Sequence, residues 1–223
     1  MRRIDVNVDI GEGQPHDEAL LEFASSASIC CGEHSGSWEL AVSTADRCRS
    51  LGVRVGAHPG FPDRASMGRR PPNAGEAERW APSVRDQIRR FQSEIGAAYL
   101  KPHGALYHFL SGLEPESIEA NLQRFGMTEG LVMALAGSPL AEALGNRCIA
   151  EGFADRRVLP SGLLVPRTEP DAVIRDPERA AANAVALAPR IDSLCLHGDT
   201  EGCVELARAI VRALRNAGWE VGA

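Results

Sequence analysis

Short apolar segments alternate with longer amphipathic segments along the chain. The apolar segments predict strands, which we place at 4–10, 28–31, 53–57, 98–101, 131–134, 152–154, 193–196 and 219–221. The amphipathic segments predict helices at 17–24, 38–51, 82–96, 115–125, 140–144, 177–187 and 201–217. Strands and helices that alternate through short connections are typical of a parallel sheet. Because no linker interrupts this pattern, we expect a single β/α domain over residues 1–223.

The first predicted strand is polar on its second face. Ile4, Val6, Val8 and Ile10 alternate there with Asp5, Asn7 and Asp9. A buried strand of a parallel sheet is usually apolar on both faces, so these polar side chains must point into a polar interior. The inside of a barrel near its mouth is such a place, and the pattern therefore favours a barrel.

Residues that can carry chemistry follow the strands at their carboxyl ends. In chain order they are Asp9, Glu12, Glu33, His34, His58, Asp63, Arg69, Arg70, Lys101, His103, Tyr107, Asp155, Arg156, Arg167, His197 and Asp199. In parallel α/β folds the ligand binds at this edge of the sheet. Four of the six histidines lie in these positions, which predicts one shared active site. The long segment 59–75, rich in Pro, Gly and Arg, is expected to be a functional loop.

Several familiar site motifs are incomplete. The Gly11–Gly13 segment has no third glycine for a dinucleotide fingerprint, and the chain has no phosphate-binding P-loop sequence. A triad of Ser161, His197 and Asp199 lacks the nucleophile-elbow sequence. Carboxylate and imidazole suit zinc or manganese, so Asp9, His58 and His103 are compatible with a metal site. Their spacing is not diagnostic, and a divalent metal stays open at this point.

Charge and hydropathy narrow the class of protein. The net charge is −6, with 24 Lys and Arg against 30 Asp and Glu, and no basic stripe suits nucleic acid. The apolar runs are far shorter than the roughly 20 residues that span a bilayer. An apolar secretory segment does not follow Met1. We therefore expect a cytoplasmic protein that binds neither nucleic acid nor a membrane.

Eight motifs together resemble the LamB/YcsF family over nearly the whole chain. They are DVNVDIGEG (5–13), CGEHSG (31–36), GAHPGFPD (56–63), GRR (68–70), KPHGALY (101–107), FADR (153–156), GLLVPR (162–167) and HGDT (197–200). The resemblance implies a TIM-like, seven-stranded β/α barrel of the glycoside hydrolase and deacetylase type. It also implies the A subunit of an ATP-dependent 5-oxoprolinase, which opens 5-oxo-L-proline to L-glutamate together with partner subunits B and C.

Opening a lactam in this way requires cations, a base and an acid. We assign catalytic roles to Asp9, Glu12, His58, Lys101, His103 and His197, and substrate binding to Asn7, His34, Asp63, Arg69, Tyr107, Asp155, Arg167 and Asp199. Lys101 and Arg167 are the expected cations, Asp9 or Glu12 the base, and a histidine the acid. ATP is expected as co-substrate in the complex. Crowded carboxyl groups raise one another's pKa, but the nearby histidines and Lys101 oppose that shift, so we expect a carboxylate paired to a protonated histidine.

Two other classes of function stay open. One is a metal-dependent deacetylase or another amide or lactam hydrolase on the same barrel, which needs no ATP. The other is a non-catalytic subunit that binds substrate. The chain departs from the family's usual pattern at Gln14, Glu33 and Arg157, all near the expected site, so a different lactam or amide is also open as substrate. The oligomeric state, including a homo-oligomer, is open as well.

Overall fold

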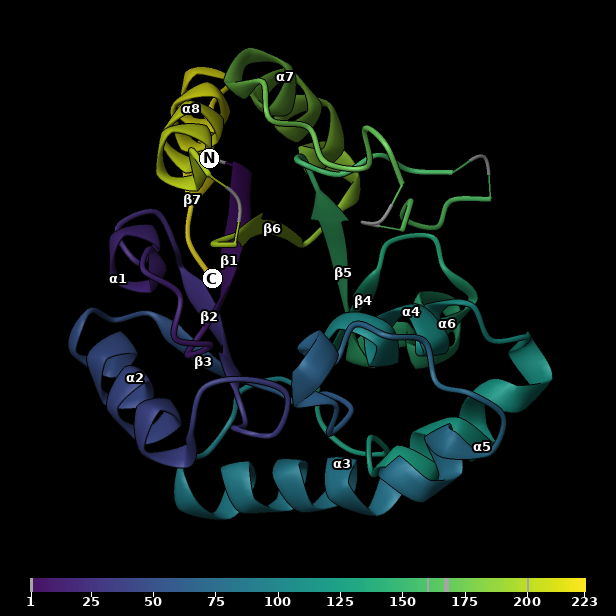
Figure 1. Cartoon of the computed structure of the whole chain (residues 1–223). Helices are drawn as coiled ribbons and strands as arrows, with labels where there is room; N and C mark the ends of the chain where they lie inside the picture. The colour runs from purple at the N-terminus through teal and green to yellow at the C-terminus, as the bar shows by residue number, and fades with distance from the viewer. Residues whose placement is uncertain (1, 160, 167–168, 200) are drawn as a thin grey trace.

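Parallel strands form the centre of the computed structural model, and helices surround them (Figure 1). The structure describes residues 2–159, 161–166, 169–199 and 201–223. The strands are β1 (Arg2–Ile10), β2 (Ser26–Cys30), β3 (Arg54–His58), β4 (Val132–Leu135), β5 (Cys148–Phe153), β6 (Ser193–His197) and β7 (Trp219–Val221). The α-helices are α1 (Asp17–Leu20), α2 (Trp38–Ser50), α3 (Glu76–Glu94), α4 (Gly104–Ser111), α5 (Pro115–Phe125), α6 (Pro139–Leu144), α7 (Pro177–Leu187) and α8 (Cys203–Asn216). Short 3-10 turns cover Arg64–Ser66, Gly145–Arg147 and Ala188–Arg190.

The sheet curves into a TIM-like barrel. Its strands follow the order β3-β2-β1-β6-β5-β4, and every pairing is parallel. Leu100 bridges the two edge strands, since it pairs with Ala57 of β3 and with Val132 of β4. The predicted strand 98–101 is thus present only as isolated bridges at Leu100, but these bridges connect the edge strands β3 and β4. β7 lies off this path and pairs with the beginning of β1.

Two predicted helices require correction. The helix expected at 82–96 begins at Glu76, and Pro82 lies inside it. Proline removes one helical hydrogen bond, but Ala77, Ala81 and Val84 continue a buried face through this point, and that burial outweighs the loss. The helix expected at 17–24 is shorter than predicted, since α1 ends at Leu20. The helix α4 begins within the KPHGALY motif and was not predicted.

The interior of the barrel is polar along β1, as the alternation predicts. Asp5 accepts hydrogen bonds from the hydroxyls of Ser26 and Ser193 at 2.7 and 2.5 Å. Asn7 donates to Ser193 at 2.8 Å and to Glu151 at 3.0 Å. These partners come from β2, β5 and β6, so buried polar groups connect the strands from within.

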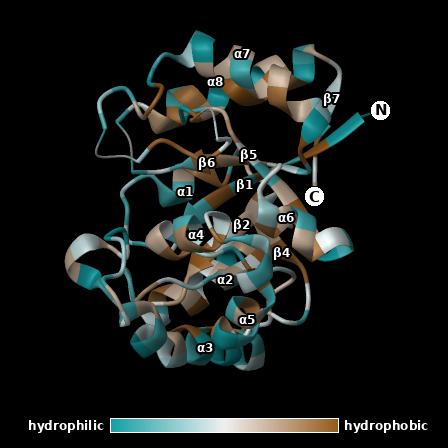
Figure 2. Cartoon of the chain, turned by 90° about the vertical axis from the view of Figure 1, so that its right-hand side faces the viewer, coloured by the Kyte–Doolittle hydropathy of each residue, from teal (hydrophilic) through white to brown (hydrophobic). Residues whose placement is uncertain are grey.

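The hydrophobic core lies between the strands and the surrounding helices. Figure 2 shows hydrophobic residues concentrated on the strands and polar residues on the outer surface of α3. The helix α8, for example, buries Leu206, Ile210 and Leu214 at helical spacing. In the described residues no helix is both long and apolar enough to cross a membrane.

Candidate active site

A cavity of about 1000 Å³ opens at the carboxyl ends of the strands. Many residues chosen from the sequence line it: Asp9, Glu12, His58, Arg69, Lys101, His103, Tyr107, His197 and Asp199. Further walls come from residues between 71 and 78 and between 153 and 166. The cavity therefore lies where ligands bind in β/α barrels.

The register of the strands explains why distant residues meet here. Asp9 on β1 pairs with His197 on β6, and His58 on β3 pairs with Cys30 on β2. Parallel strands that end together bring their last side chains to one mouth. The expectation that the histidines and Asp9 share one end of the sheet agrees with these positions.

Lys101 lies at the bottom of the cavity and is almost fully buried. Its Nζ atom is 2.7 Å from Asp9 Oδ1, 2.7 Å from Glu151 Oε1 and 3.0 Å from Asn7 Oδ1. An ammonium group has three N–H donors, and the hydrogen bonds to Asp9, Asn7 and Cys195 use all of them, while Glu151 adds an ion pair. Lys101, expected as one of the two cations of the site, is thus the centre of a buried charge network.

Lys101 is also the chain's only lysine, while the other basic residues are arginines. A compact ammonium can point its three protons at three separate acceptors, whereas a planar guanidinium presents a rigid fork. The Cys195 Sγ atom, 3.1 Å from Nζ, fills the remaining side of this cage. The single use of lysine in an arginine-rich chain is a sequence signal for this site.

The protonation states of this network follow from its charges. Burial by itself lowers the pKa of Lys101, but Asp9, Cys195 and Glu151 outweigh it and hold this pKa well above its usual range. Burial raises the pKa of Asp9, but the charges of His58, Lys101 and His197 hold it well below its usual range. The expected carboxylate form of Asp9 agrees with this direction, because the charges of nearby cations outweigh burial.

Burial of Lys101 leads to a test by chemical labelling. We expect an amine acylating reagent to leave Lys101 unmodified in the native protein and to modify it after unfolding in guanidinium, because its Nζ is buried and its three N–H groups are hydrogen-bonded. Peptide mass spectrometry gives the modified fraction, and the single lysine makes the assignment unambiguous. Rapid acylation in the native state would contradict the buried cage.

His197 forms a dyad with Asp155. Its Nδ1 atom is 2.7 Å from Asp155 Oδ2, which places the proton on Nδ1 and leaves Nε2 as a base when the ring is neutral. The ring stacks on Phe153, with centroids 5.6 Å apart and planes 16° from parallel. Asp155 therefore orients a histidine that lines the cavity, as a carboxylate does in many proton-transfer sites.

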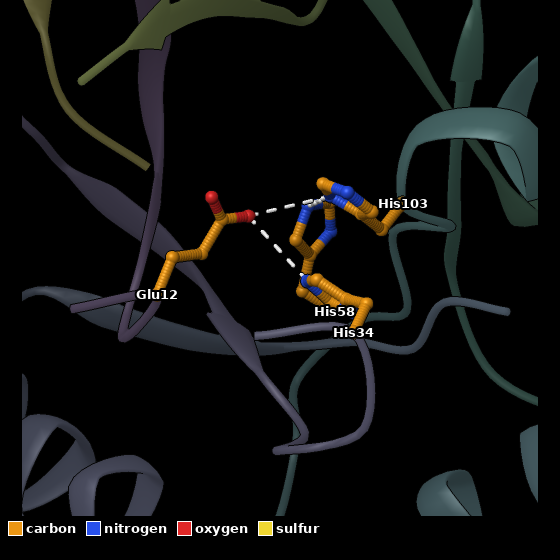
Figure 3. A group of neighbouring side chains, drawn as sticks. All are labelled: Glu12, His34, His58 and His103. Carbon is orange, nitrogen blue, oxygen red and sulfur yellow. Dashed lines mark hydrogen bonds and ion pairs between the residues drawn. The ribbon is translucent and has the colours of Figure 1, made fainter. Parts of the chain in front are cut away.

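Three further histidines gather opposite Glu12, as Figure 3 shows. His103 Nδ1 is 2.9 Å from His58 Nε2 and 3.3 Å from Glu12 Oε1, and His34 Nε2 is 3.4 Å from that same oxygen. Burial, together with neighbouring histidines, holds the pKa of His34 and of His103 well below the usual range. His34 does not line the cavity but lies beneath His103, with the two rings stacked 3.8 Å apart.

Polar groups on the cavity wall complete the site. Arg69 pairs with Asp199 at 2.7 Å, and its side chain is 35% exposed. Burial and the negative charge of Glu151 raise the pKa of Tyr107 well above its usual range, so its hydroxyl keeps its proton. The Arg69 guanidinium and the neutral Tyr107 hydroxyl are thus two polar groups of the cavity wall.

Other predicted residues lie elsewhere. Asp63 accepts hydrogen bonds from Ser66 and Arg70 at 2.6 and 3.2 Å, so it holds the loop 59–75 and is not among the residues that line the cavity. Asn7 lies below Lys101, as its bond to Nζ shows. Arg156 lines the cavity and donates to the Val165 carbonyl at 2.7 Å. Arg167 lies outside the described residues.

Sequence analysis missed Glu151, the second buried partner of Lys101. We placed its strand at 152–154, whereas β5 begins at Cys148 and includes this residue. Ile149, Glu151 and Phe153 share one face of β5, and Glu151 is the polar residue on this face. A buried carboxylate in a short strand could have indicated a cation partner.

Comparison with known proteins gives consistent results. The model of the LamB/YcsF family matches residues 4–223. The chain is 37% identical over 248 residues to the A subunit of 5-oxoprolinase from Neisseria meningitidis serogroup C, with 100% of both chains covered. It is 34% identical over 246 residues to the A subunit of 5-oxoprolinase from Histophilus somni, covering 98% of this chain and 97% of that protein.

Solved structures agree on the fold. The lactam utilization protein of Thermus thermophilus superposes with a TM-score of 0.79 at 30% identity, and 99% of both chains is covered. The family 4 carbohydrate esterase of Streptomyces lividans has a TM-score of 0.53 at 8% identity, covering 100% of this chain and 92% of the esterase. At that identity the esterase shows a shared barrel fold alone, of the deacetylase type expected from the sequence.

Proposed function

The chain belongs to the LamB/YcsF family, and from that premise we propose that it is the A subunit of an ATP-dependent 5-oxoprolinase. In this role it opens the lactam of 5-oxo-L-proline to L-glutamate, with ATP hydrolysis, in a complex with subunits B and C in the cytoplasm. The observation that carries the proposal is the cavity that combines the buried Asp9–Lys101 pair with the His197–Asp155 dyad. Full-length relatives that bear the name of this subunit support the same function.

The cavity offers groups for binding a small lactam acid. Arg69 uses one terminal nitrogen for Asp199, and a guanidinium carries five N–H donors, so it has donors for the carboxylate of 5-oxoproline. We assign the Tyr107 hydroxyl as a hydrogen-bond donor to the lactam oxygen, because its raised pKa keeps the proton in place. Arg167 stays a proposed second cation.

The proton transfers are assigned to the His197–Asp155 dyad. His197 Nε2 accepts a proton from the attacking water, and the protonated ring then donates to the departing lactam nitrogen. Asp155, at 2.7 Å from Nδ1, stabilises the ring in its charged state. Asp9 is a weak base because its pKa is low, so we assign it an electrostatic role beside His58 and His197.

Coupling to ATP is the reason for partner subunits. An amide carbonyl is a poor electrophile, and phosphorylation of its oxygen makes attack by water feasible. Cleavage of the C–N bond then leaves an acyl phosphate, which a second water hydrolyses to L-glutamate and phosphate. Neither of the two familiar nucleotide-binding sequences occurs in the chain. We therefore propose that subunits B and C complete the ATP-dependent step and that this chain supplies the residues for ring opening.

The test compares the chain alone with the assembled complex. We expect the purified chain to release negligible glutamate from 5-oxoproline, with or without ATP, because the coupling step needs its partners. Co-expression with subunits B and C is expected to give 5-oxoproline-dependent ADP release in step with glutamate formation. Steady turnover of 5-oxoproline by the single chain would contradict this division of labour. Turnover of N-acetylated sugars by the single chain would favour the deacetylase alternative.

A further inference from the structure

Glu12, His34, His58 and His103 form a cluster beside the charge network, and we call these four residues the histidine cluster. They come from four segments: the turn after β1, the turn after β2, the end of β3 and the residue before α4. One nitrogen or oxygen of each lies within 4.8 Å of those of the others. Figure 3 shows the Glu12 carboxylate facing the three rings.

Backbone hydrogen bonds determine which ring nitrogens carry protons. His103 Nε2 lies 2.8 Å from the Met67 carbonyl oxygen, and His58 Nδ1 lies 2.8 Å from the Lys101 carbonyl oxygen. A carbonyl oxygen only accepts, so both of these nitrogens donate. In neutral rings the opposite nitrogens, His103 Nδ1 and His58 Nε2, then hold lone pairs. These two lone pairs face each other at 2.9 Å, so a positive species is needed between them.

A shared proton would satisfy only two of the four groups. It leaves both ring nitrogens of His34 without a hydrogen-bond partner among the described residues, although this side chain has 0% exposure. It also leaves Glu12 Oε1 without one. Buried polar atoms without partners are costly. A metal ion satisfies all four groups at once, because His34 Nε2 and Glu12 Oε1 belong to the same cluster.

The surroundings hold the cluster in place. The His34 ring stacks on the His103 ring, and the two ring planes are only 4° from parallel. A Cβ atom at Gly60 would come within 2.6 Å of His34 Nδ1, and one at Gly68 within 2.9 Å of His34 Cβ. Both glycines are therefore needed for this close packing. The two backbone carbonyls that orient His58 and His103 act as the outer-shell partners that ligating histidines commonly have.

We propose that Glu12, His34, His58 and His103 bind one divalent transition metal ion of the zinc type. Three imidazole nitrogens and one carboxylate oxygen suit zinc, cobalt or iron(II), whereas magnesium and calcium prefer oxygen ligands. Glu12, His58 and His103 also line the cavity, so the ion lies at its wall. The proposal depends on these four residues and not on the identity of the substrate.

A second group of potential ligands, Asp9, Cys195 and His197, also lies within 4.8 Å. It is a poorer cation site, because Lys101 Nζ already lies 2.7 Å from Asp9 and 3.1 Å from Cys195. A metal ion there would face a buried ammonium group. The histidine cluster has no such cation in contact with Glu12 or His34 among the interactions described.

The experiment measures metal binding and not turnover. The protein is stripped with a chelator and titrated with Zn²⁺ by calorimetry and with Co²⁺ by visible absorption. We expect one ion per chain and a rise in melting temperature with Zn²⁺, since the ion binds the folded state. Glu12→Gln keeps the side-chain shape and His34→Phe keeps a stacking ring. Each removes one ligand and is expected to weaken Zn²⁺ binding by at least about tenfold, the lower end of what even outer-shell changes cost.

The controls separate a metal from a shared proton. Glu18→Gln, at an exposed ion pair with Arg47, is expected to bind Zn²⁺ as the wild type does. His34→Phe should fold with unchanged metal-free stability, because His34 has no hydrogen bond to lose. The proposal is overturned if the wild type binds no stoichiometric ion. It is equally overturned if both ligand variants bind like the wild type, which would assign the ion to Asp9, Cys195 and His197.

Discussion

Asp9→Asn is expected to lower 5-oxoproline-dependent ADP release by the assembled complex about 100-fold or more, the scale for losing one preorganised charged group. Asparagine keeps the shape of the side chain but removes the charge that balances Lys101, 2.7 Å away. The ammonium charge then lies uncompensated near His197, on the strand paired with Asp9. Steady-state kinetics at saturating 5-oxoproline and ATP would measure the loss.

The matched control is Glu18→Gln on α1. Glu18 pairs with Arg47, and both side chains are at least half exposed, so its removal is expected to leave turnover nearly unchanged. Gel filtration should show both variants in complexes of wild-type size, and KM should change much less than kcat. Full activity in Asp9→Asn together with inactivity in Glu18→Gln would exclude the barrel mouth as the active site.

Lys101→Met is expected to reduce the free energy of unfolding by about 3–5 kcal/mol, because removing one partner leaves buried charges uncompensated. The orphaned groups are Asp9 and Glu151, and Asn7 loses a hydrogen bond. For a chain of this size the expected fall in melting temperature is roughly 6–20 °C. Urea denaturation and calorimetry would measure both quantities.

Arg47→Met serves as the control for Lys101→Met. It removes an ion pair that is exposed to solvent, so its expected cost is far smaller than that of Lys101→Met. Adding Glu151→Gln to Lys101→Met should restore part of the stability, since it removes one of the two uncompensated carboxylates. Equal losses for Lys101→Met and Arg47→Met would show that the buried network does not contribute as proposed.

Local pattern was sufficient to predict much of the fold. Helices α5 and α7 and strand β7 have the predicted bounds, because a proline at the first turn or a glycine at an end marks a boundary locally. The predicted start of α3 at Pro82 was wrong, because the helix continues through this proline. Burial of a helix face is a tertiary effect that local sequence rules do not include. Glu151 was missed for a related reason: its value as a partner depends on Lys101, fifty residues away in the chain.

What the sequence by itself determined is the alternation of strands and helices, the polar face of β1, and the placement of reactive side chains after the strands. These features depend on periodicity and on neighbours in the chain. Only the tertiary structure decided the roles within the site. The register beside β6 brings Asp9 to His197, and the contacts of the Lys101 ammonium group make it the centre of a buried charge network. The positions of the ring protons on His58 and His103 likewise depend on the backbone carbonyls of Lys101 and Met67, which come from other segments. Hydrogen bonds are directional and short, so such roles follow from three-dimensional position and not from residue type.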